Sequence, residues 1–171
     1  FLIWLDILLA LSDQVSPKDK NFDLLSIDID GNDYHILESL KKYTPKIIII
    51  EFNPTIPNEI EFVQKKDFKI KQGCSARSLV NLAKKKNYEL VASTLTNLFF
   101  VDKSYSDLIS KTPINLDDLI DDREIQNYIF CGYDGTLHTT KPIKLGWHKI
   151  QIKNKHIQPL PSSLRNFPDD Y

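Results

Sequence analysis

Methionine is absent from all 171 residues, and the chain starts with Phe1. Because translation starts with methionine, we expect this sequence to lack its natural beginning, through processing or because it is a fragment. Cysteine is nearly as scarce. Cys74 and Cys131 are too few for the disulfide framework of a secreted protein, which favours a reducing, cytoplasmic location.

An excess of either charge is also missing, since 22 basic and 23 acidic side chains leave a net charge of -1. This balance predicts neither nucleic acid nor an anionic membrane as a partner. The apolar opening "FLIWLDILLALS" is too short to span a bilayer and contains Asp6. It has no basic segment and no small-residue cleavage site, so it is not typical of a signal peptide. We expect a helix over residues 1–14.

The next segments alternate between strand and helix patterns. The apolar stretch "FDLLSIDI" (22–29) predicts a strand, and the spacing of apolar residues after it predicts a helix up to about Tyr43. The stretch "KIIIIEF" (46–52) predicts a second strand, covered on both faces because its isoleucines do not alternate with polar residues. Strand, helix and strand together predict a parallel pair with a right-handed crossover.

A long loop and a hairpin follow. The loop over 53–74 has the length typical of a lid or binding segment. Ser75 is a suitable N-cap for a helix over 76–87, whose apolar residues share one face. The stretches "YELVAST" (88–94) and "NLFFVD" (97–102) are joined by two residues, which predicts an antiparallel pair.

The composition changes after residue 102. An acidic stretch predicts two short helices, and the end of the chain, rich in proline, aromatic and basic residues, predicts short strands and extended chain. We therefore divide the sequence into a domain over 1–102 and an irregular C-terminal annex over 103–171.

Polar residues follow both predicted parallel strands. Asp28, Asp30 and Asn32 come after the first strand, and Glu51 and Asn53 after the second. Ligands of open α/β sheets bind outside the carboxyl ends of the strands. The sequence therefore predicts one site at this edge.

A calcium site is one interpretation of "DIDGNDYHILES". Asp28, Asp30 and Asn32 match positions 1, 3 and 5 of an EF-hand loop. However, Asp33 and Ser39 stand where that loop needs glycine and glutamate, and a strand precedes the motif.

A phosphatase is the second interpretation. The stretch "SIDIDGN" resembles the first motif of haloacid-dehalogenase-type phosphatases, with Asp28 as nucleophile and Asp30 as general acid. That family has serine or threonine after its second strand, where this chain has "EFN". A purely structural interpretation also stands, in which Asp30, Asn32 and Asp33 form the turn and cap the following helix.

A third family accounts for more of the chain. The stretches "DLLSIDIDGNDYHILESL", "PKIIIIEFNPTIP", "SARSLVNLAKKKNYELVAST" and "TNLFFVD" resemble the C-terminal half of a class I S-adenosylmethionine-dependent methyltransferase, most closely the FkbM type. The resemblance implies a Rossmann-like, doubly wound α/β fold, here its C-terminal portion with two parallel strands and an antiparallel hairpin. It also implies methyl transfer, with the oxygen of a small molecule or sugar as the expected acceptor.

The resemblance also implies roles for the polar residues. Asp28, Asp30 and Glu51 are the candidate catalytic residues, and Asp28 and Asn32 are the candidate cofactor-binding residues. The candidate substrate-binding residues are Asn53 and His35. Asp28 and Asp30 are in addition candidate ligands of a divalent metal.

The chain departs from this family in its glycines. The family binds its cofactor with a glycine-rich turn after its first strand, whereas no two of the five glycines here are spaced G-x-G. We therefore expect the main cofactor site to lie in an N-terminal half absent from this sequence, so that the chain alone is inactive. A degenerate domain that only binds a partner is the non-enzymatic alternative. Because the family's first strand, which would pair with it, is also absent from this sequence, we expect the strand at 24–29 to be an open apolar edge, which predicts self-association.

Overall fold

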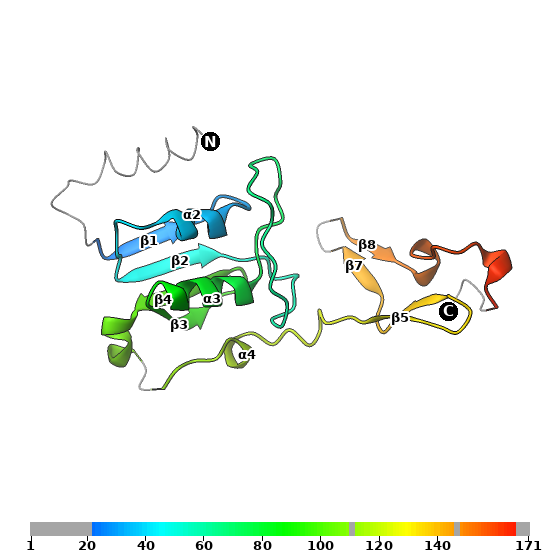
Figure 1. Cartoon of the computed structure of the whole chain (residues 1–171). Coiled ribbons are helices and arrows are strands. Elements are labelled where there is room, and N and C mark those ends of the chain that lie inside the picture. Colours follow the sequence, from blue (N-terminus) through cyan, green and yellow to red (C-terminus); the bar gives the residue numbers. More distant parts are fainter. Residues whose placement is uncertain (1–21, 110–111, 146–147, 167–171) are drawn as a thin grey trace. The chain divides into compact units, whose positions relative to one another are not determined.

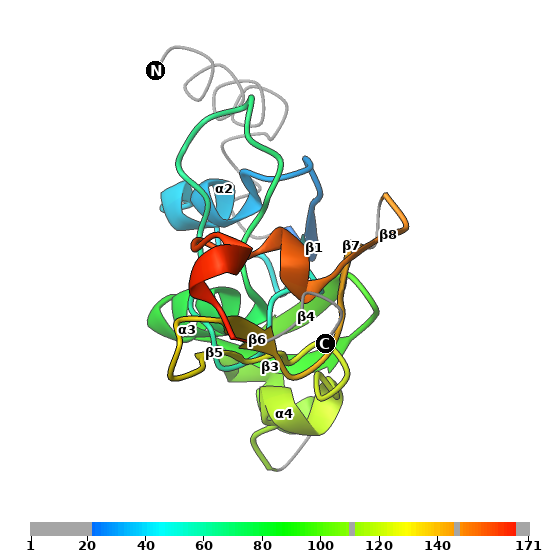
Figure 2. The ribbon, with the colours of Figure 1, turned by 90° about the vertical axis from the view of Figure 1, so that its right-hand side faces the viewer.

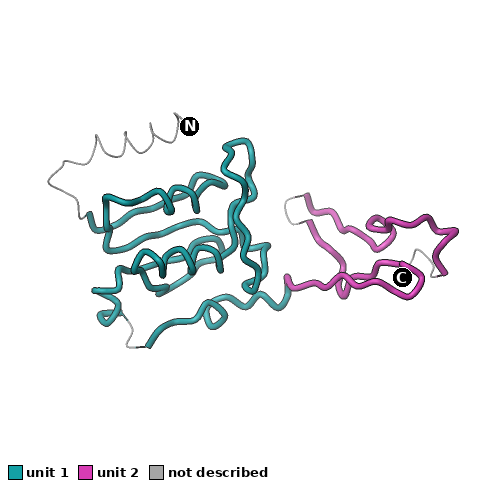
Figure 3. Tube along the Cα trace, in the orientation of Figure 1, with its two compact units in different colours: residues 1–124 teal, residues 125–171 magenta. Residues whose placement is uncertain are grey.

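The computed structural model describes residues 22–109, 112–145 and 148–166. The helix expected over 1–14 lies outside these residues. The chain forms two compact units, residues 1–124 and 125–171 (Figure 3). Residues 103–124, which the sequence pattern groups with the annex, cluster with the first unit.

The first unit contains a four-stranded mixed sheet with the order β1-β2-β4-β3 (Figure 1). Its strands are β1 (Leu24–Ile27), β2 (Ile47–Glu51), β3 (Tyr88–Ser93) and β4 (Asn97–Asp102). The pair β1 and β2 is parallel, whereas β4 is antiparallel to both β2 and β3. The predicted parallel pair and the predicted hairpin are both confirmed, and the fold is α/β.

Two helices cover one face of this sheet (Figures 1 and 2). They are α2 (Asp33–Ser39) and α3 (Ala76–Lys85). Their apolar sides pack on the strands in a core whose most deeply buried side chains include Leu37, Ile48, Ile50, Leu79, Leu98 and Phe100. Ser75 caps α3 as predicted, because its side chain accepts a hydrogen bond from the Ser78 amide.

Two details of the sheet and its first helix differ from the sequence prediction. Helix α2 ends at Ser39, four residues before Tyr43, because the backbone becomes extended at Leu40. The carbonyl oxygen of Leu40 accepts a hydrogen bond of 2.7 Å from the ammonium group of Lys86.

Strand β2 was expected to be buried on both faces, but only one of its faces is fully buried. Ile48 is fully buried, whereas Ile47 is 37% exposed, because α2 and α3 lie on the same face.

Strand β1 is an edge strand within the described part of the chain, where it pairs with β2 alone. Leu24 at its start is 53% exposed. For the described residues this confirms the expected one-sided pairing of the strand. None of the described helices is long and apolar enough to cross a membrane.

The remaining elements are short. In the first unit the described residues also form a 3-10 helix, η1 (Lys103–Leu108), and α4 (Leu116–Leu119), which confirms the two short helices expected after residue 102. The described part of the second unit forms two hairpins and two 3-10 turns, which agrees with the expected short strands. Its elements are β5 (Ile129–Cys131), β6 (Leu137–Thr139), β7 (Ile143–Leu145), β8 (Ile150–Ile152), η2 (Asn154–His156) and η3 (Ser162–Leu164).

Candidate functional site

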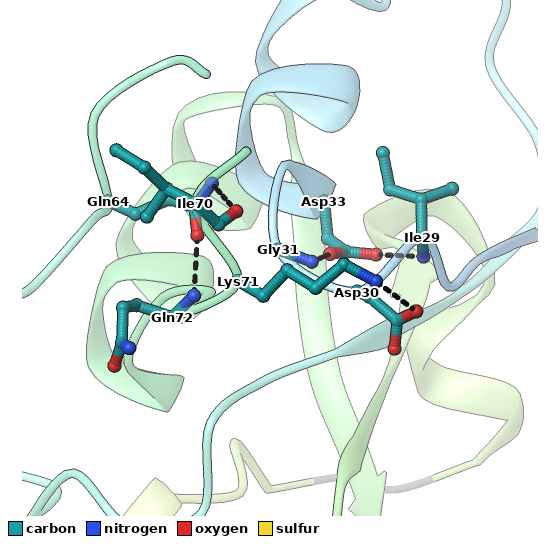
Figure 4. A network of polar contacts seen from close by, with 8 residues as sticks. All are labelled: Ile29, Asp30, Gly31, Asp33, Gln64, Ile70, Lys71 and Gln72. Carbon is teal, nitrogen blue, oxygen red and sulfur yellow. Dashed lines mark hydrogen bonds and ion pairs between the residues drawn. The ribbon is translucent and has the colours of Figure 1, made fainter. Parts of the chain in front are cut away.

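The turn between β1 and α2 is folded around the carboxylate of Asp33. This side chain is 1% exposed. Its two oxygens accept hydrogen bonds of 2.9 Å from the backbone N–H groups of Ile29 and Gly31 (Figure 4). The backbone between them takes positive φ angles, 55° at Asp30 and 139° at Gly31. Asp33 therefore stabilises the turn, whereas the helix cap of the turn-and-cap interpretation is not formed, since no described side chain makes a capping hydrogen bond at the start of α2.

Three other carboxylates meet at the carboxyl ends of β1 and β2. Asp28, Asp30 and Glu51 each offer an oxygen atom, and these atoms lie within 4.8 Å of one another. Asp28 and Asp30 are exposed, while Glu51 is half-buried. The parallel register of β1 and β2 pairs Ile27 with Ile50 and so brings the residues that follow each strand together. We call these three residues the carboxylate cluster.

The acidity of Glu51 is strongly perturbed by its surroundings. Burial, followed by the negative charges of Asp28, Asp33 and Asp30, raises the pKa of Glu51 from 4.5 to about 7. A carboxyl group with a pKa near neutral pH can accept a proton from a substrate and release it again. A carboxyl group of near-neutral pKa therefore lies at the edge where the sequence predicts a site.

The long loop between β2 and α3 carries a lobe that lies against this site. Residues 52–75, which the structure describes throughout, contain a single isolated bridge, between Val63 and Cys74. This bridge closes residues 64–73 into a compact loop, here called the lobe. Gln64 is only 3% exposed and lies inside it.

The side chain of Gln64 holds the lobe together from within (Figure 4). Its Oε1 atom accepts hydrogen bonds of 2.8 Å from the backbone N–H groups of Gln72 and Gly73. Its Nε2 group donates to the carbonyl oxygens of Ile70, at 2.9 Å, and Asp67, at 3.3 Å. One buried amide thus satisfies backbone groups along the whole lobe.

The lobe packs directly on the turn that follows β1. A Cβ atom at Gly31 would lie 2.8 Å from Gln64 Oε1 and 2.9 Å from the carbonyl oxygen of Ile70. On the outer side, Lys71 Nζ lies 3.4 Å from the carboxylate of Asp30 (Figure 4). Glycine is therefore required at position 31 both by its positive φ angle and by the close approach of the lobe.

Two predicted site residues take part in this packing. Asn32 is the N-cap residue of α2, yet its side chain makes no capping hydrogen bond. Instead its Nδ2 group donates to the carbonyl oxygen of Asp67, and its buried Oδ1 atom has no hydrogen-bond partner among the described residues. His35 Nε2 lies 2.9 Å from the carbonyl oxygen of Gln64. Both side chains hold the lobe against α2.

Asn53 lies at the other end of the loop. Its Nδ2 group donates to the carbonyl oxygen of Gln72, and its Oδ1 atom accepts from the amide and the hydroxyl of Thr55. The sequence pattern did not single out Gln64 or Lys71. Neither has a distinctive spacing, and only the path of the loop brings them to the site.

The carboxylate cluster has the chemistry of a site for a hard cation. Three carboxylate oxygens within 4.8 Å of one another can ligate a divalent ion such as Mg²⁺ or Ca²⁺. The ammonium group of Lys71 beside Asp30 already offsets part of their negative charge.

Comparison with known proteins bears on the segment that carries this site. Residues 9–89 match the family model described as "Methyltransferase FkbM domain". This segment runs from before β1 to the start of β3 and includes the carboxylate cluster and the lobe. No curated protein and no solved structure matches the chain significantly. The resemblance to the FkbM family of methyltransferases is thus confirmed for residues 9–89.

Proposed function

We propose that the chain is part of an S-adenosylmethionine-dependent O-methyltransferase and that the carboxylate cluster faces the methyl acceptor. The observation that carries the proposal is the position of Glu51. It lies at the carboxyl end of β2, beside Asp28 and Asp30, with a pKa of about 7. A base of this strength suits the removal of a proton from a hydroxyl group.

The sheet order supports a Rossmann-like fold of the class I methyltransferase type. Strand order β1-β2-β4-β3, with β4 antiparallel to both neighbours, agrees with the C-terminal portion of that fold as the sequence resemblance describes it. In this proposal β1 and β2 correspond to the fourth and fifth strands of the family, and the β3–β4 hairpin to the sixth and seventh.

S-adenosylmethionine, when bound, supplies an electrophilic methyl group. Glu51 would accept the proton of the acceptor hydroxyl as that oxygen bonds to the methyl carbon and the carbon–sulfur bond of the sulfonium breaks, with the neutral thioether as leaving group. Asp28 and Asp30 are exposed and accept hydrogen bonds from further hydroxyl groups, which orients the acceptor for in-line transfer. The carboxylate cluster offers several hydrogen-bond acceptors, which suits a ligand with several hydroxyl donors. We therefore propose a sugar or another polyol as the acceptor class.

We propose that these 171 residues supply only part of the contacts to S-adenosylmethionine. Of the two predicted cofactor-binding residues, Asp28 is exposed to a ligand, whereas Asn32 is 1% exposed. The chain contains no G-x-G pair that could hold the adenosine end of the cofactor. We therefore expect the 171 residues alone to bind S-adenosylmethionine poorly. Calorimetric titration tests this, and a low-micromolar dissociation constant would show that the cofactor site is misplaced.

Methyl transfer itself is tested with radiolabelled S-adenosylmethionine and a panel of sugars and small polyols. The assay uses the natural protein that contains this chain, including any sequence upstream of Phe1. We expect label in a polyol product, with more than a hundredfold loss of turnover in Glu51→Gln, which is the lower end of the contribution of a general base. Glu59→Gln, an exposed carboxyl in the following loop, is the matched control and should retain activity.

Two alternatives are separated by parallel assays. If Asp28 were a phosphatase nucleophile, the chain would hydrolyse p-nitrophenyl phosphate with Mg²⁺ and lose this activity in Asp28→Asn; we expect no hydrolysis. If Asp28 and Asp30 held a catalytic metal, methyl transfer would stop on chelation with EDTA and return with Mg²⁺. If methyl transfer persists in EDTA, the carboxylates bind the methyl acceptor directly and do not act through a metal.

A further inference from the structure

We propose that Gln64 is a positioning residue of the carboxylate cluster: its buried side chain fixes the lobe against Gly31 and thereby holds the ammonium group of Lys71 beside Asp30. The proposal rests on the proposed function only in treating the cluster as an acceptor site. The structural part stands on the contacts of Gln64 alone.

The side-chain amide of Gln64 uses its full hydrogen-bonding capacity inside the lobe. The amide of Gln64 makes two hydrogen bonds as an acceptor and two as a donor, all to the backbone of residues 67–73. A loop without regular secondary structure has few other means of fixing its path. Removal of this amide would leave the N–H groups of residues 72 and 73 and the carbonyl group of Ile70 without this partner, so the lobe should open, whereas the carbonyl group of Asp67 keeps its hydrogen bond from Asn32.

The lobe also packs directly on the turn that follows β1. The absence of a side chain at Gly31 lets Gln64 Oε1 and the carbonyl oxygen of Ile70 approach the backbone that follows β1. Asn32 and His35 add one contact each, to the carbonyl oxygens of Asp67 and Gln64. The lobe is therefore fixed relative to the end of β1 and not only folded internally.

The lobe also places a positive charge, that of Lys71, beside the carboxylate cluster. Lys71 and Asp30 are 67% and 70% exposed, and an ion pair between such side chains contributes little by itself. The pair is localised because the lobe fixes the backbone of Lys71. The groups that face Glu51 are Asp28 and Asp30 after β1, Asp33 at the start of α2 and, through Asp30, Lys71 on the lobe. Loss of the lobe would remove the cation and leave the three negative charges.

The experiment uses the full chain labelled with ¹⁵N and ¹³C, and compares Gln64→Ala, Gln64→Glu and Gln72→Ala by NMR. Gln72 has the same side chain on the same lobe but is exposed, which makes Gln72→Ala the matched control. In Gln64→Ala the amide protons of residues 72 and 73 should lose their protection from hydrogen exchange. In Gln64→Glu part of this protection should also be lost, because a carboxylate still accepts both hydrogen bonds but cannot donate to the carbonyl oxygens of Asp67 and Ile70.

The second readout is the proximity of Lys71 to Asp30, measured as nuclear Overhauser effects between their side-chain protons. In Gln64→Ala these effects should be lost, because the lobe no longer fixes the backbone of Lys71. Lys71→Ala should leave the protection of residues 72 and 73 unchanged, because an ion pair between exposed side chains contributes little. Neither readout needs cofactor or acceptor, so failure here and failure of methyl transfer are distinguishable.

The proposal is overturned if residues 72 and 73 stay protected in Gln64→Ala, or if Gln72→Ala produces the same loss. It is also overturned if the Overhauser effects between Lys71 and Asp30 persist in Gln64→Ala, or if Lys71→Ala by itself removes the protection of residues 72 and 73. Protection of the α3 amides reports whether each variant is folded. Should Gln64→Ala unfold, Gln64→Glu, which keeps two of the four hydrogen bonds, decides the question.

Discussion

Replacement of Glu51 by glutamine should stabilise the chain at high pH. Glutamine has the size of a protonated glutamate but never ionises. In the wild type, burial and three neighbouring carboxylates raise the pKa of Glu51 from 4.5 to about 7. Below pH 4.5 the residue is protonated in both the folded and the unfolded chain, and the variant has no advantage. Between pH 4.5 and 7 the unfolded chain ionises first, so the wild-type fold loses stability as the pH rises.

The size of the effect follows from the same shift. A change from 4.5 to about 7 corresponds to about 3 kcal/mol at 1.36 kcal/mol per pH unit. Glu51 is only half-buried, so solvent screens part of this penalty. We therefore expect Glu51→Gln to be more stable than the wild type by roughly 1–2 kcal/mol above pH 7.5, with the difference vanishing near pH 4.5.

Urea denaturation of the 171-residue chain between pH 4 and pH 8.5 measures this difference. Glu59→Gln is the control for the loss of one exposed carboxyl and should follow the wild-type curve. A Glu51→Gln variant that is less stable than the wild type at pH 8, or a difference that does not depend on pH, would refute the reasoning. The first outcome would mean that the folded chain stabilises the ionised form of Glu51, so that its pKa is not raised.

Three further predictions concern the elements around the site. Asp33→Ala should cost about 2–4 kcal/mol of unfolding free energy, because two backbone N–H groups lose their acceptor; a loss below 1 kcal/mol in urea denaturation would show that the turn does not depend on this carboxylate. Gly31→Ala should cost about 1–3 kcal/mol and expose the lobe to limited proteolysis, because its Cβ would lie 2.8 Å from Gln64 Oε1; an unchanged proteolysis rate would contradict the packing described. If β1 is an open edge, the chain should self-associate, and Leu24→Lys should raise the monomer fraction in sedimentation velocity; a wild-type chain that is monomeric at all concentrations would remove that expectation.

The elements that sequence patterns predicted well are those governed by local periodicity. The unbroken isoleucines of β2, the N-cap at Ser75 and the short link between β3 and β4 each restrict the local backbone strongly. The meeting of Asp28, Asp30 and Glu51 also follows from the sequence, because the carboxyl ends of parallel strands lie at one edge.

The parts that could not be predicted depend on the path of an irregular loop. Gln64 and Lys71 belong to a segment with no periodic pattern, and their contacts exist only because the loop folds back on Gly31. The same path determines the contacts of His35 and Asn53, whose side chains lie against backbone carbonyl oxygens of the lobe. The elevated pKa of Glu51 required the burial and the distances as well as the order of residues.

The pH dependence of methyl transfer tests the central claim most directly. If Glu51 is the general base, the turnover of the natural protein at saturating acceptor should rise with pH through a midpoint near 7, since only the ionised carboxylate accepts the proton. Glu51→Gln should lose this step together with at least a hundredfold of the rate. A Glu51→Gln variant that keeps the wild-type rate and the same rise near pH 7 would contradict the account.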